Sequence, residues 1–388
     1  MLYSYSFQNR KRDLSDILST VVKDEPRFIS NFKTVAAAGN QKHEWLEDQI
    51  CGRSVTVSGA VSALSCPGAA ADLAKLKPGT LLVINGDSAL FRVTSVSDKA
   101  FTVVLAGANG SATTTPASGD VMNIVSTPMA EGSNNGDGDE SGIIGNVNYN
   151  YMQIFRKEII LSGSAIANST YGNVDNNLNR QTAFALGELA RDLNRVALFG
   201  ARVAGGAAAR GEAGGLYFFG TQSNSMQQAA GGNRLDSYMV NDAAQAIMSA
   251  GGNPMQILCS PGQARVLSGE YKNQLQILRS DERRGAYVAV IVNEINGRGM
   301  TIMADPDIPD TDAWVLDPAG FGLSNLKGRA IADEDATPKG FDGVKRMALG
   351  ELTFEFKNAA QRLCRISGLQ GSTAALTAIR AVKTTVTE

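Results

Sequence analysis

Among the residues that could do chemistry, one histidine comes first. His43 is the only histidine among the 388 residues, so a Ser-His-Asp or Cys-His site would have to use it. It lies near Trp45 in a segment with too little apolar sequence to fold alone, and the chain has no Gly-x-Ser-x-Gly motif. A lone histidine in such a segment is more often structural or exposed than catalytic. The sequence therefore predicts no catalytic residues.

Two acidic stretches are candidate binding sites, and the ligand that they could bind is a metal ion. The first, ADPDIPDTD, holds Asp305, Asp307, Asp310 and Asp312, and its two prolines predict a rigid surface loop after a strand. The second, residues 131–140, does not have the twelve-residue spacing of an EF-hand, so we interpret it as a solvated loop. We predict no metal site in either stretch. A hydrolase that uses carboxylates alone stays open.

Cofactor and redox motifs are missing from the sequence. It contains neither a Walker loop nor Gly-x-Gly-x-x-Gly, although 41 residues are glycine. The four cysteines, Cys51, Cys66, Cys259 and Cys364, are scattered without a Cys-x-x-Cys pair. This spacing favours reduced thiols in a cytoplasm-like compartment over a disulfide framework or a zinc site. We therefore predict no cofactor.

Composition narrows the possible partners. The net charge of −2 argues against tight wrapping of nucleic acid by the chain as a whole. The chain has no apolar run approaching 18 residues and no secretory h-region at its start, so neither a membrane span nor a membrane partner is expected. With 388 residues, it is long enough for two or three domains with real cores.

The most strongly patterned element is a predicted long helix, residues 174–202. Apolar or small residues recur at steps of three and four, which places them in one stripe along a helix. These are Leu178, Thr182, Leu186, Leu189, Leu193, Val196 and Gly200. At 1.5 Å per residue, a helix of about 24 residues would be about 36 Å long. An element of this length usually braces a sheet.

Strand patterns surround this helix. Four or five short strands between residues 53 and 126, with a turn at Asn85-Gly86-Asp87, predict a small sandwich or barrel inserted into the main fold. Residues 149–161 read as a long strand, and residues 238–314 alternate helix and strand. Residues 203–234 read as a loop.

The sequence pattern near the C-terminus predicts a strand with one buried face and one solvent-exposed face. Leu352, Phe354 and Phe356 alternate with polar residues, so Glu351, Thr353 and Glu355 are expected to face solvent. Residues 362–366 are expected to continue the same sheet, and the sequence after Gly371 reads as a weakly specified tail.

The order of several stretches resembles a known family. They are HEWLED, TLLVINGDSALFRVTSVS, NYNYMQIFRKEIILSGSA, ALGELARDLNRVALFGAR, the Arg210–Leu216 run ending in GGL, and LGELTFEFKNAAQRLCRISGL. Together they span about residues 40–370. In this order they resemble the major capsid proteins of tailed bacteriophages, in the group with a β insertion near the N-terminus.

The resemblance implies an α+β fold, the shell fold shared by tailed phages and herpesviruses. Its expected parts are an N-terminal arm (1–45), an extended loop with the β insertion (46–148), a peripheral domain (149–235) with a spine helix (174–202), an α/β axial domain (236–335), returning peripheral strands (336–370) and a C-terminal tail (371–388).

The resemblance also implies a structural function. Many copies, as pentamers and hexamers, would form an icosahedral shell around double-stranded DNA, assembled in the host cytoplasm and found in the virion. Packaged DNA would need no sequence-specific contacts, and portal, scaffold and decoration proteins would be further partners. The residues expected to face neighbours, the interior or the spine are Arg180, Glu188, Arg191, Arg195, Trp45 and Phe28.

Two other classes stay open. An encapsulin-like shell that stores a protein cargo would have the same fold and lack DNA. An adhesin or glycan-binding protein built around the β insertion would form only small oligomers. An enzyme is the third and least favoured alternative.

Overall fold

A computed structural model describes most of the chain. The described residues are 26–47, 54–62, 64–84, 89–106, 115–129, 131–132, 146–167, 177–206, 209–222, 225–270 and 290–385. The first part of the expected arm, residues 1–25, and the expected turn at residues 85–87 lie outside them. The chain divides into two compact units, residues 1–45 with 147–388, and residues 46–146.

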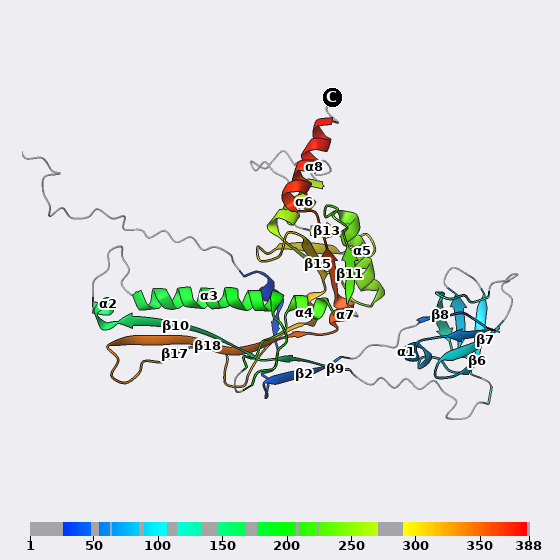
Figure 1. Ribbon diagram of the computed structural model, residues 1–388, viewed down its shortest axis with the longest axis horizontal. Coiled ribbons are helices and arrows are strands. Elements are labelled where there is room, and N and C mark those ends of the chain that lie inside the picture. The colour runs from blue at the N-terminus through cyan, green and yellow to red at the C-terminus, as the bar shows by residue number, and fades with distance from the viewer. Residues whose placement is uncertain are drawn as a thin grey trace, which may run out of the picture. The chain divides into compact units, whose positions relative to one another are not determined.

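The larger unit contains a five-stranded sheet braced by one long helix. The strand order is β1 (Lys33–Thr34), β16 (Phe321–Asn325), β18 (Gly343–Phe356) and β10 (Gln153–Ser162), and β17 (Ala332–Asp335) also pairs with β18. Helix α3 (Asn177–Phe199) lies along β10 and β18 (Figure 1). The predicted long helix is therefore confirmed, and it ends at Phe199, three residues before the predicted end. The short helix α2 (Gly163–Ala167) follows β10.

The buried stripe of α3 differs in part from the predicted one. Leu189 and Leu193 are buried as expected, together with Ala185 and Ala197. Leu186, which the spacing assigned to the stripe, is 38% exposed, so that assignment was wrong. The helix buries small alanines as well as leucines, and a pattern read from large apolar residues alone shifts the stripe around the helix axis.

A six-stranded sheet forms the second half of this unit. Its order is β11 (Met226–Ala229), β19 (Leu363–Ser367), β15 (Asp312–Leu316), β12 (Gln256–Cys259), β14 (Gly299–Ala304) and β13 (Val290–Val292). Helices α5 (Ser237–Ser249), α6 (Pro261–Glu270) and α8 (Ser372–Thr385) accompany it. Shorter elements are the 3₁₀ turns η2 (Phe28–Asn31) and η4 (Pro318–Gly320), and helices α4 (Leu216–Gly220) and α7 (Ala359–Arg362).

Three expectations for this part were wrong. Strand β19 pairs with β15 and β11, so it joins the second sheet and does not continue the sheet of β18. Strand β11 lies in a stretch read as loop, and the tail after Gly371 contains helix α8. Strands β16 and β17, which lie within residues 236–335, pair in the first sheet. Strand partners far apart in sequence leave no local pattern, which is why the assignment of β19 failed.

The second half of strand β18, residues 350–356, is buried on both faces where one solvent-exposed face was predicted. Glu351, Thr353 and Glu355 are all nearly inaccessible to solvent, so this prediction was wrong. Glu351 pairs with Arg329 at 3.0 Å, and Thr353 donates a hydrogen bond to the Tyr151 carbonyl at 2.9 Å. Polar residues on this face are therefore covered and satisfied by partners from other segments.

The smaller unit is a closed barrel, as one of the two predicted forms. Its strands follow the order β3 (Ser54–Thr56), β8 (Val121–Ser126), β5 (Leu81–Ile84), β6 (Leu90–Val96), β7 (Ala100–Leu105) and β4 (Ser65–Pro67), and helix α1 (Ala70–Leu73) follows β4. A bridge between Val57 and Gly68 joins the two outer strands. Leu82, Phe91 and Phe101 fill the interior. Closure removes exposed strand edges, which small sheets otherwise leave open.

Substitution of two glycines by alanine tests the packing around Trp314 and along α3. A Cβ at Gly220 would collide with the buried Trp314 ring, so Gly220→Ala should lower the free energy of unfolding by about 1–3 kcal/mol. A Cβ at Gly187, inside α3, would meet no atom within 4 Å. Gly187→Ala should therefore stabilise the protein by about 0.5–1 kcal/mol. Chemical denaturation of both variants checks this pair, and equal effects would contradict the packing described.

Candidate assembly site

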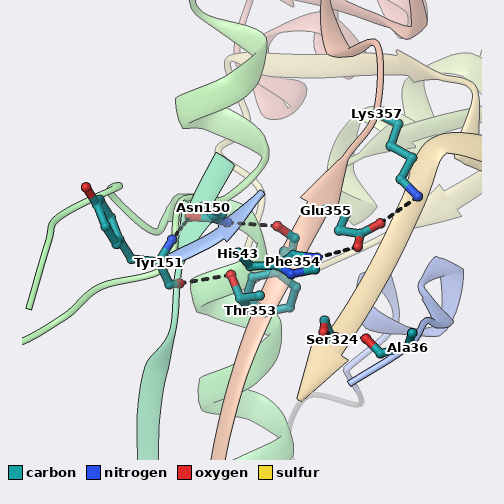
Figure 2. A network of polar contacts seen from close by, with 9 residues as sticks. All are labelled: Ala36, His43, Asn150, Tyr151, Ser324, Thr353, Phe354, Glu355 and Lys357. Atoms are coloured by element: carbon teal, nitrogen blue, oxygen red, sulfur yellow. Dashed lines mark hydrogen bonds and ion pairs between the residues drawn. The ribbon is translucent and has the colours of Figure 1, made fainter. Parts of the chain in front are cut away.

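The first candidate for a functional site is the pair of strands that precedes and follows the barrel in the sequence. Strands β2 (Lys42–Glu47) and β9 (Asn146–Tyr151) pair with each other, and we call this pair the ribbon root. Asn150 is fully buried and donates hydrogen bonds to the carbonyls of Gly214 at 3.0 Å and Phe354 at 2.8 Å. Its side-chain oxygen accepts from the Gly214 amide at 2.7 Å. Figure 2 shows Asn150 and Tyr151 lying against β18. The root is therefore fixed to the five-stranded sheet.

A carboxylate at the same place holds the other strand of the root. His43 Nε2 lies 2.5 Å from Glu355 Oε1, and Lys357 Nζ lies 2.9 Å from Glu355 Oε2 (Figure 2). Burial alone would raise the pKa of Glu355, but the contacts with His43 and Lys357 outweigh burial and lower it. Glu355 is thus an anion at neutral pH. The lone histidine therefore contacts a buried carboxylate.

The acidic loop 305–312 is a joint inside the larger unit. Asp305, fully buried, accepts hydrogen bonds from the Phe28 amide at 3.3 Å and from Asn194 Nδ2 at 3.1 Å. Asp307 pairs with Arg195 at 2.9 Å. These contacts tie the second sheet to helix α3 and to the 3₁₀ turn η2 within the arm. The prediction of a surface loop was wrong for Asp305, because its donors come from segments more than a hundred residues away.

The second half of the loop makes hydrogen bonds with residues at the N-termini of two helices and with a cluster of aromatic side chains. Asp310 accepts from Ser260 Oγ at 2.6 Å and from the Ser372 amide at 2.5 Å, next to the N-termini of α6 and α8. Burial alone would raise the pKa of Asp310, but these hydrogen bonds lower it. Asp312 accepts from Tyr217 Oη at 2.9 Å and pairs with Arg365 at 2.7 Å. Carboxylates at helix starts satisfy free N–H groups and oppose the positive end of the helix dipole.

The candidate residues of α3 make contacts within the chain. Arg195 binds the acidic loop, and Glu188 lies 3.8 Å from Lys157 of β10, which Asp192 also binds at 2.7 Å. Arg180 lies over the Phe184 ring, and Arg191 is half-buried. Their contact with a neighbouring copy or the shell interior stays a prediction.

The two aromatic candidates lie in the core of the larger unit. Phe28 is fully buried, and its ring packs edge-on against Phe32 and Phe321. Trp45 is also buried, with its ring 6.0 Å from that of Phe219. Their side chains thus fix the arm and the ribbon root to their own chain. A role toward a neighbouring subunit stays a prediction for both.

Sequence reasoning missed the role of four polar residues that hold these joints: Asn150, Asn194, Asp310 and Glu355. One of them left a usable signal. Asn194 stands between buried Leu193 and Ala197 on α3, whereas the strand of Asn150 reads NVNYNY, which places Asn150 on the polar side of its alternation. A polar side chain at a position that the pattern assigns to the core requires a hydrogen-bond partner.

One face of the five-stranded sheet has no helix over it among the described residues. Residues of β10 alternate, and Phe155 and Lys157 lie on the α3 side. The opposite side carries Ile154 and Ile160, each 57% exposed. We call this side the open sheet face. A sheet normally buries its apolar face against another layer, so this face is a candidate interface.

A broad cleft of about 1450 Å³ lies beside β10. Its lining includes Ile154, Arg156, Arg195, Phe199, Arg210 and Arg329. The lining therefore combines exposed aliphatic and aromatic groups with guanidinium groups. Such a lining suits an extended peptide with aromatic side chains, because guanidinium groups stack on aromatic rings.

Other chemistry finds little support in the described residues. Burial raises the pKa of Cys66 and Cys364 to about 11 and of Cys259 to about 12, so these thiols are protonated and unreactive. No group of three or more His, Cys, Asp or Glu side chains in the described part of the chain is arranged to hold a metal ion. Within the same part, none of the helices combines the length and the apolar character that a membrane crossing requires.

Comparisons with known proteins agree on one class. A family model described as "SU10 major capsid protein" matches residues 2–370. A capsid subunit of cyanophage A-1(L) is 12% identical with a TM-score of 0.59, over 95% of this chain and 100% of that chain. A capsid subunit of an empty GTA particle is 10% identical with a TM-score of 0.51, over 95% and 100%. These two likenesses show the fold.

Two further comparisons complete the findings. An encapsulin complex from Synechococcus elongatus is 10% identical with a TM-score of 0.41, over 60% of this chain and 79% of that chain. No protein with a curated description matches the sequence.

The Asp310 contacts predict that the C-terminal helix depends on one carboxylate. Asp310→Ala removes the acceptor of the Ser372 amide, so we expect a loss of about 0.5–2 kcal/mol in the free energy of unfolding. Hydrogen exchange of residues 372–379 should accelerate more than that of α5. Asp242→Ala, at an exposed position on α5, is the control. Unchanged exchange in α8 of the Asp310 variant would contradict the joint.

The Glu355 contacts predict an acid-dependent stability. Because the pKa of Glu355 is lowered in the folded protein, its contribution is present at neutral pH and is lost as pH falls below the ordinary value of 4.5. Glu355→Gln should cost about 1–3 kcal/mol at pH 7 and should flatten the fall in stability between about pH 5 and pH 3. Denaturation at several pH values checks this, with Glu44→Gln, at an exposed position, as control. Parallel pH profiles for wild type and Glu355→Gln would refute the argument.

Proposed function

Because the chain belongs to the SU10 major capsid protein family and its place is the capsid of a phage virion, we propose the following assembly. Many copies associate as pentamers and hexamers into a closed icosahedral shell that encloses double-stranded DNA. Assembly takes place in the host cytoplasm. Portal, scaffold and decoration proteins are further partners of such a shell.

The observation that carries this proposal is the open sheet face. Ile154 and Ile160 are exposed on β10, and the cleft extends the same surface past Met347 and Leu349 of β18. A subunit that remained single would leave these two isoleucines in water, beside the ion-paired Arg156, Glu158 and Lys345 on the same face. Repeated association of copies buries them, and the larger unit with its internal joints forms a stiff body on which such contacts can repeat.

We assign roles to the parts of the fold on the same basis. Helix α3 is the spine, the five-stranded sheet is the peripheral layer, and the six-stranded sheet with its helices is the axial part. The barrel, residues 54–126, is the β insertion carried by the ribbon root. The arm and the barrel contribute contacts with neighbours.

The proposed relation to DNA is containment without sequence readout. The chain has a net charge of −2, and Arg156, Arg195 and Arg329 are each paired with an acidic side chain. Paired guanidinium groups contribute little to phosphate binding, which depends on uncompensated cations. We further propose that the chain has no catalytic activity, because His43, Asp305 and Asp312 all serve as structural contacts.

Particle formation tests the proposal as a whole. Purified protein should form capsomers or large hollow particles by sedimentation and electron microscopy. A well-behaved monomer under all assembly conditions would count against the function.

A charge on the open sheet face tests the observation that carries it. Ile160→Asp leaves the buried side of β10 unchanged, so the subunit should fold while the yield of particles falls at least tenfold. Ile295→Asp replaces an exposed isoleucine outside this face and is the matched control. Circular dichroism and thermal denaturation confirm folding of both variants. Normal particles from the Ile160 variant would show that the open sheet face is not an interface.

A further inference from the structure

The turn that joins β13 to β14 contains an asparagine whose side chain is folded back along its own backbone. Asn296 and Gly297 are consecutive in this turn, and both are exposed to solvent. Asn296 Oδ1 accepts a hydrogen bond from the backbone N–H of Arg298 at 2.9 Å. The ring that this hydrogen bond closes contains the peptide nitrogen of Gly297, so the side-chain amide and this nitrogen are held in one tight loop.

An asparagine in this arrangement reacts with its own backbone. The Gly297 nitrogen, once it has lost its proton to the solvent, attacks Cγ of Asn296 and forms a new C–N bond. The bond from Cγ to the side-chain nitrogen then breaks, and that nitrogen takes up a proton and leaves as ammonia. The product is a five-membered succinimide, which one water molecule opens to aspartate or isoaspartate. Glycine favours the attack because it has no Cβ to obstruct it.

The Arg298 amide assists this reaction. Negative charge develops on Oδ1 when Cγ is attacked, and a backbone N–H already aimed at that oxygen stabilises the charge, as the donors of an oxyanion hole do. The same hydrogen bond restricts rotation of the Asn296 side chain, so less conformational freedom is lost on the way to the transition state.

One contact opposes the attack. The Gly297 N–H donates a hydrogen bond to the Asn293 carbonyl at 2.9 Å, and this bond must open before the nitrogen can react. Residues 294–299 are all exposed, so water replaces the lost partner. A single exposed hydrogen bond therefore slows the reaction by about tenfold at most, relative to the unfolded chain.

The same turn contains a matched comparison. Asn293 Oδ1 accepts a hydrogen bond from the Ile295 N–H at 2.9 Å, with the same spacing along the chain. Asn293 is fully buried, however, and the residue that follows it is Glu294, whose side chain hinders attack. The Glu294 nitrogen also donates to Asn241 Oδ1 at 3.4 Å. Exposure and the following glycine thus distinguish Asn296 from Asn293.

We propose that Asn296 is a self-modification site, at which the folded protein converts an uncharged amide into aspartate or isoaspartate without an enzyme. Water is the only co-reactant. The sequence has four Asn-Gly pairs, and this one lies within the described residues. The conversion runs in one direction, so its extent records the age of each copy.

The modification weakens one edge of the six-stranded sheet. Strand β13 is the last strand in the order of this sheet, and it pairs through Ile291 with Met300 and through Val292 with Gly299. Isoaspartate inserts one extra carbon atom into the backbone of the turn that sets this register. The new carboxylate also adds a negative charge two residues from Glu294. Aged copies therefore hold β13 less firmly.

Mass spectrometry of aged protein tests the site. The native full-length chain is incubated at physiological temperature, at neutral and at mildly alkaline pH, and peptides that contain residues 293 and 296 are quantified for exchange of amide for acid. Asn296 should convert at least tenfold faster than Asn293. The rate should rise with pH, because the Gly297 nitrogen attacks only after it has lost its proton. The same chain in denaturant gives the reference rate.

Two variants connect the chemistry to β13. Asn296→Gln keeps an amide but would have to form a six-membered ring, so it should stay unmodified. Asn296→Asp carries the new charge on a normal backbone. Hydrogen exchange of residues 290–292 should accelerate in aged wild type and stay unchanged in aged Asn296→Gln. Asn296→Asp should show a smaller acceleration, because its backbone has no extra carbon atom.

The outcomes decide the proposal without reference to shell assembly. Conversion of Asn296 in the native chain, at about a tenth or more of its rate in denaturant, supports the site. Asn296 that stays intact in the native chain while it converts in denaturant overturns it. Equal rates at Asn293 and Asn296 overturn the assignment to exposure and to the following glycine. Complete conversion with unchanged exchange of residues 290–292 overturns the weakening of β13.

Discussion

The buried carboxylate of Asp305 is the interaction on which the larger unit depends. It accepts hydrogen bonds from the backbone of η2 and from Asn194 of α3, and it stands at the end of strand β14 in the other sheet. A buried acceptor that loses its donors is costly, so these three elements keep their places together. Asp307, Asp310 and Asp312 extend the same loop to Arg195, to the starts of α6 and α8, and to the aromatic cluster around Trp314. The eight residues of this loop thus join most of the layers.

This arrangement explains how the five-stranded and six-stranded sheets of the larger unit are held together. The apolar core runs from Phe28 and the α3 leucines through Trp314 to Phe356, so it includes residues of both sheets. Apolar contacts alone would allow the layers to slide, because they have no direction. The directed hydrogen bonds of the acidic loop and of Asn150 fix the register of the layers. A shell needs subunits of fixed shape, because small angular errors accumulate around a closed surface.

The sequence predicted the elements that have a local period and missed the partners that do not. The recurrence of apolar or small residues at steps of three and four was enough to predict α3, and the strand spacing was enough to predict a small inserted β unit. The glutamates of β18 were placed in solvent because an alternating strand with charges normally has a wet face. Their partners, His43, Lys357 and Arg329, come from other segments, and nothing near Glu355 in the sequence announces them. The same reason applies to β19, which pairs with β15 about fifty residues earlier in the sequence. It also applies to Asp310, whose two serine partners lie at the N-termini of two separate helices.

The ribbon root has a consequence for engineering. Strands β2 and β9 are paired, so the chain enters and leaves the barrel through neighbouring positions. Insertions between adjacent chain ends disturb a host fold least. The barrel is therefore a natural place for exchange: another compact domain whose own termini lie close together can replace residues 54–126 while Asn150, Glu355 and Trp45 still hold the base. A particle built this way would display one foreign domain per copy on a common lattice.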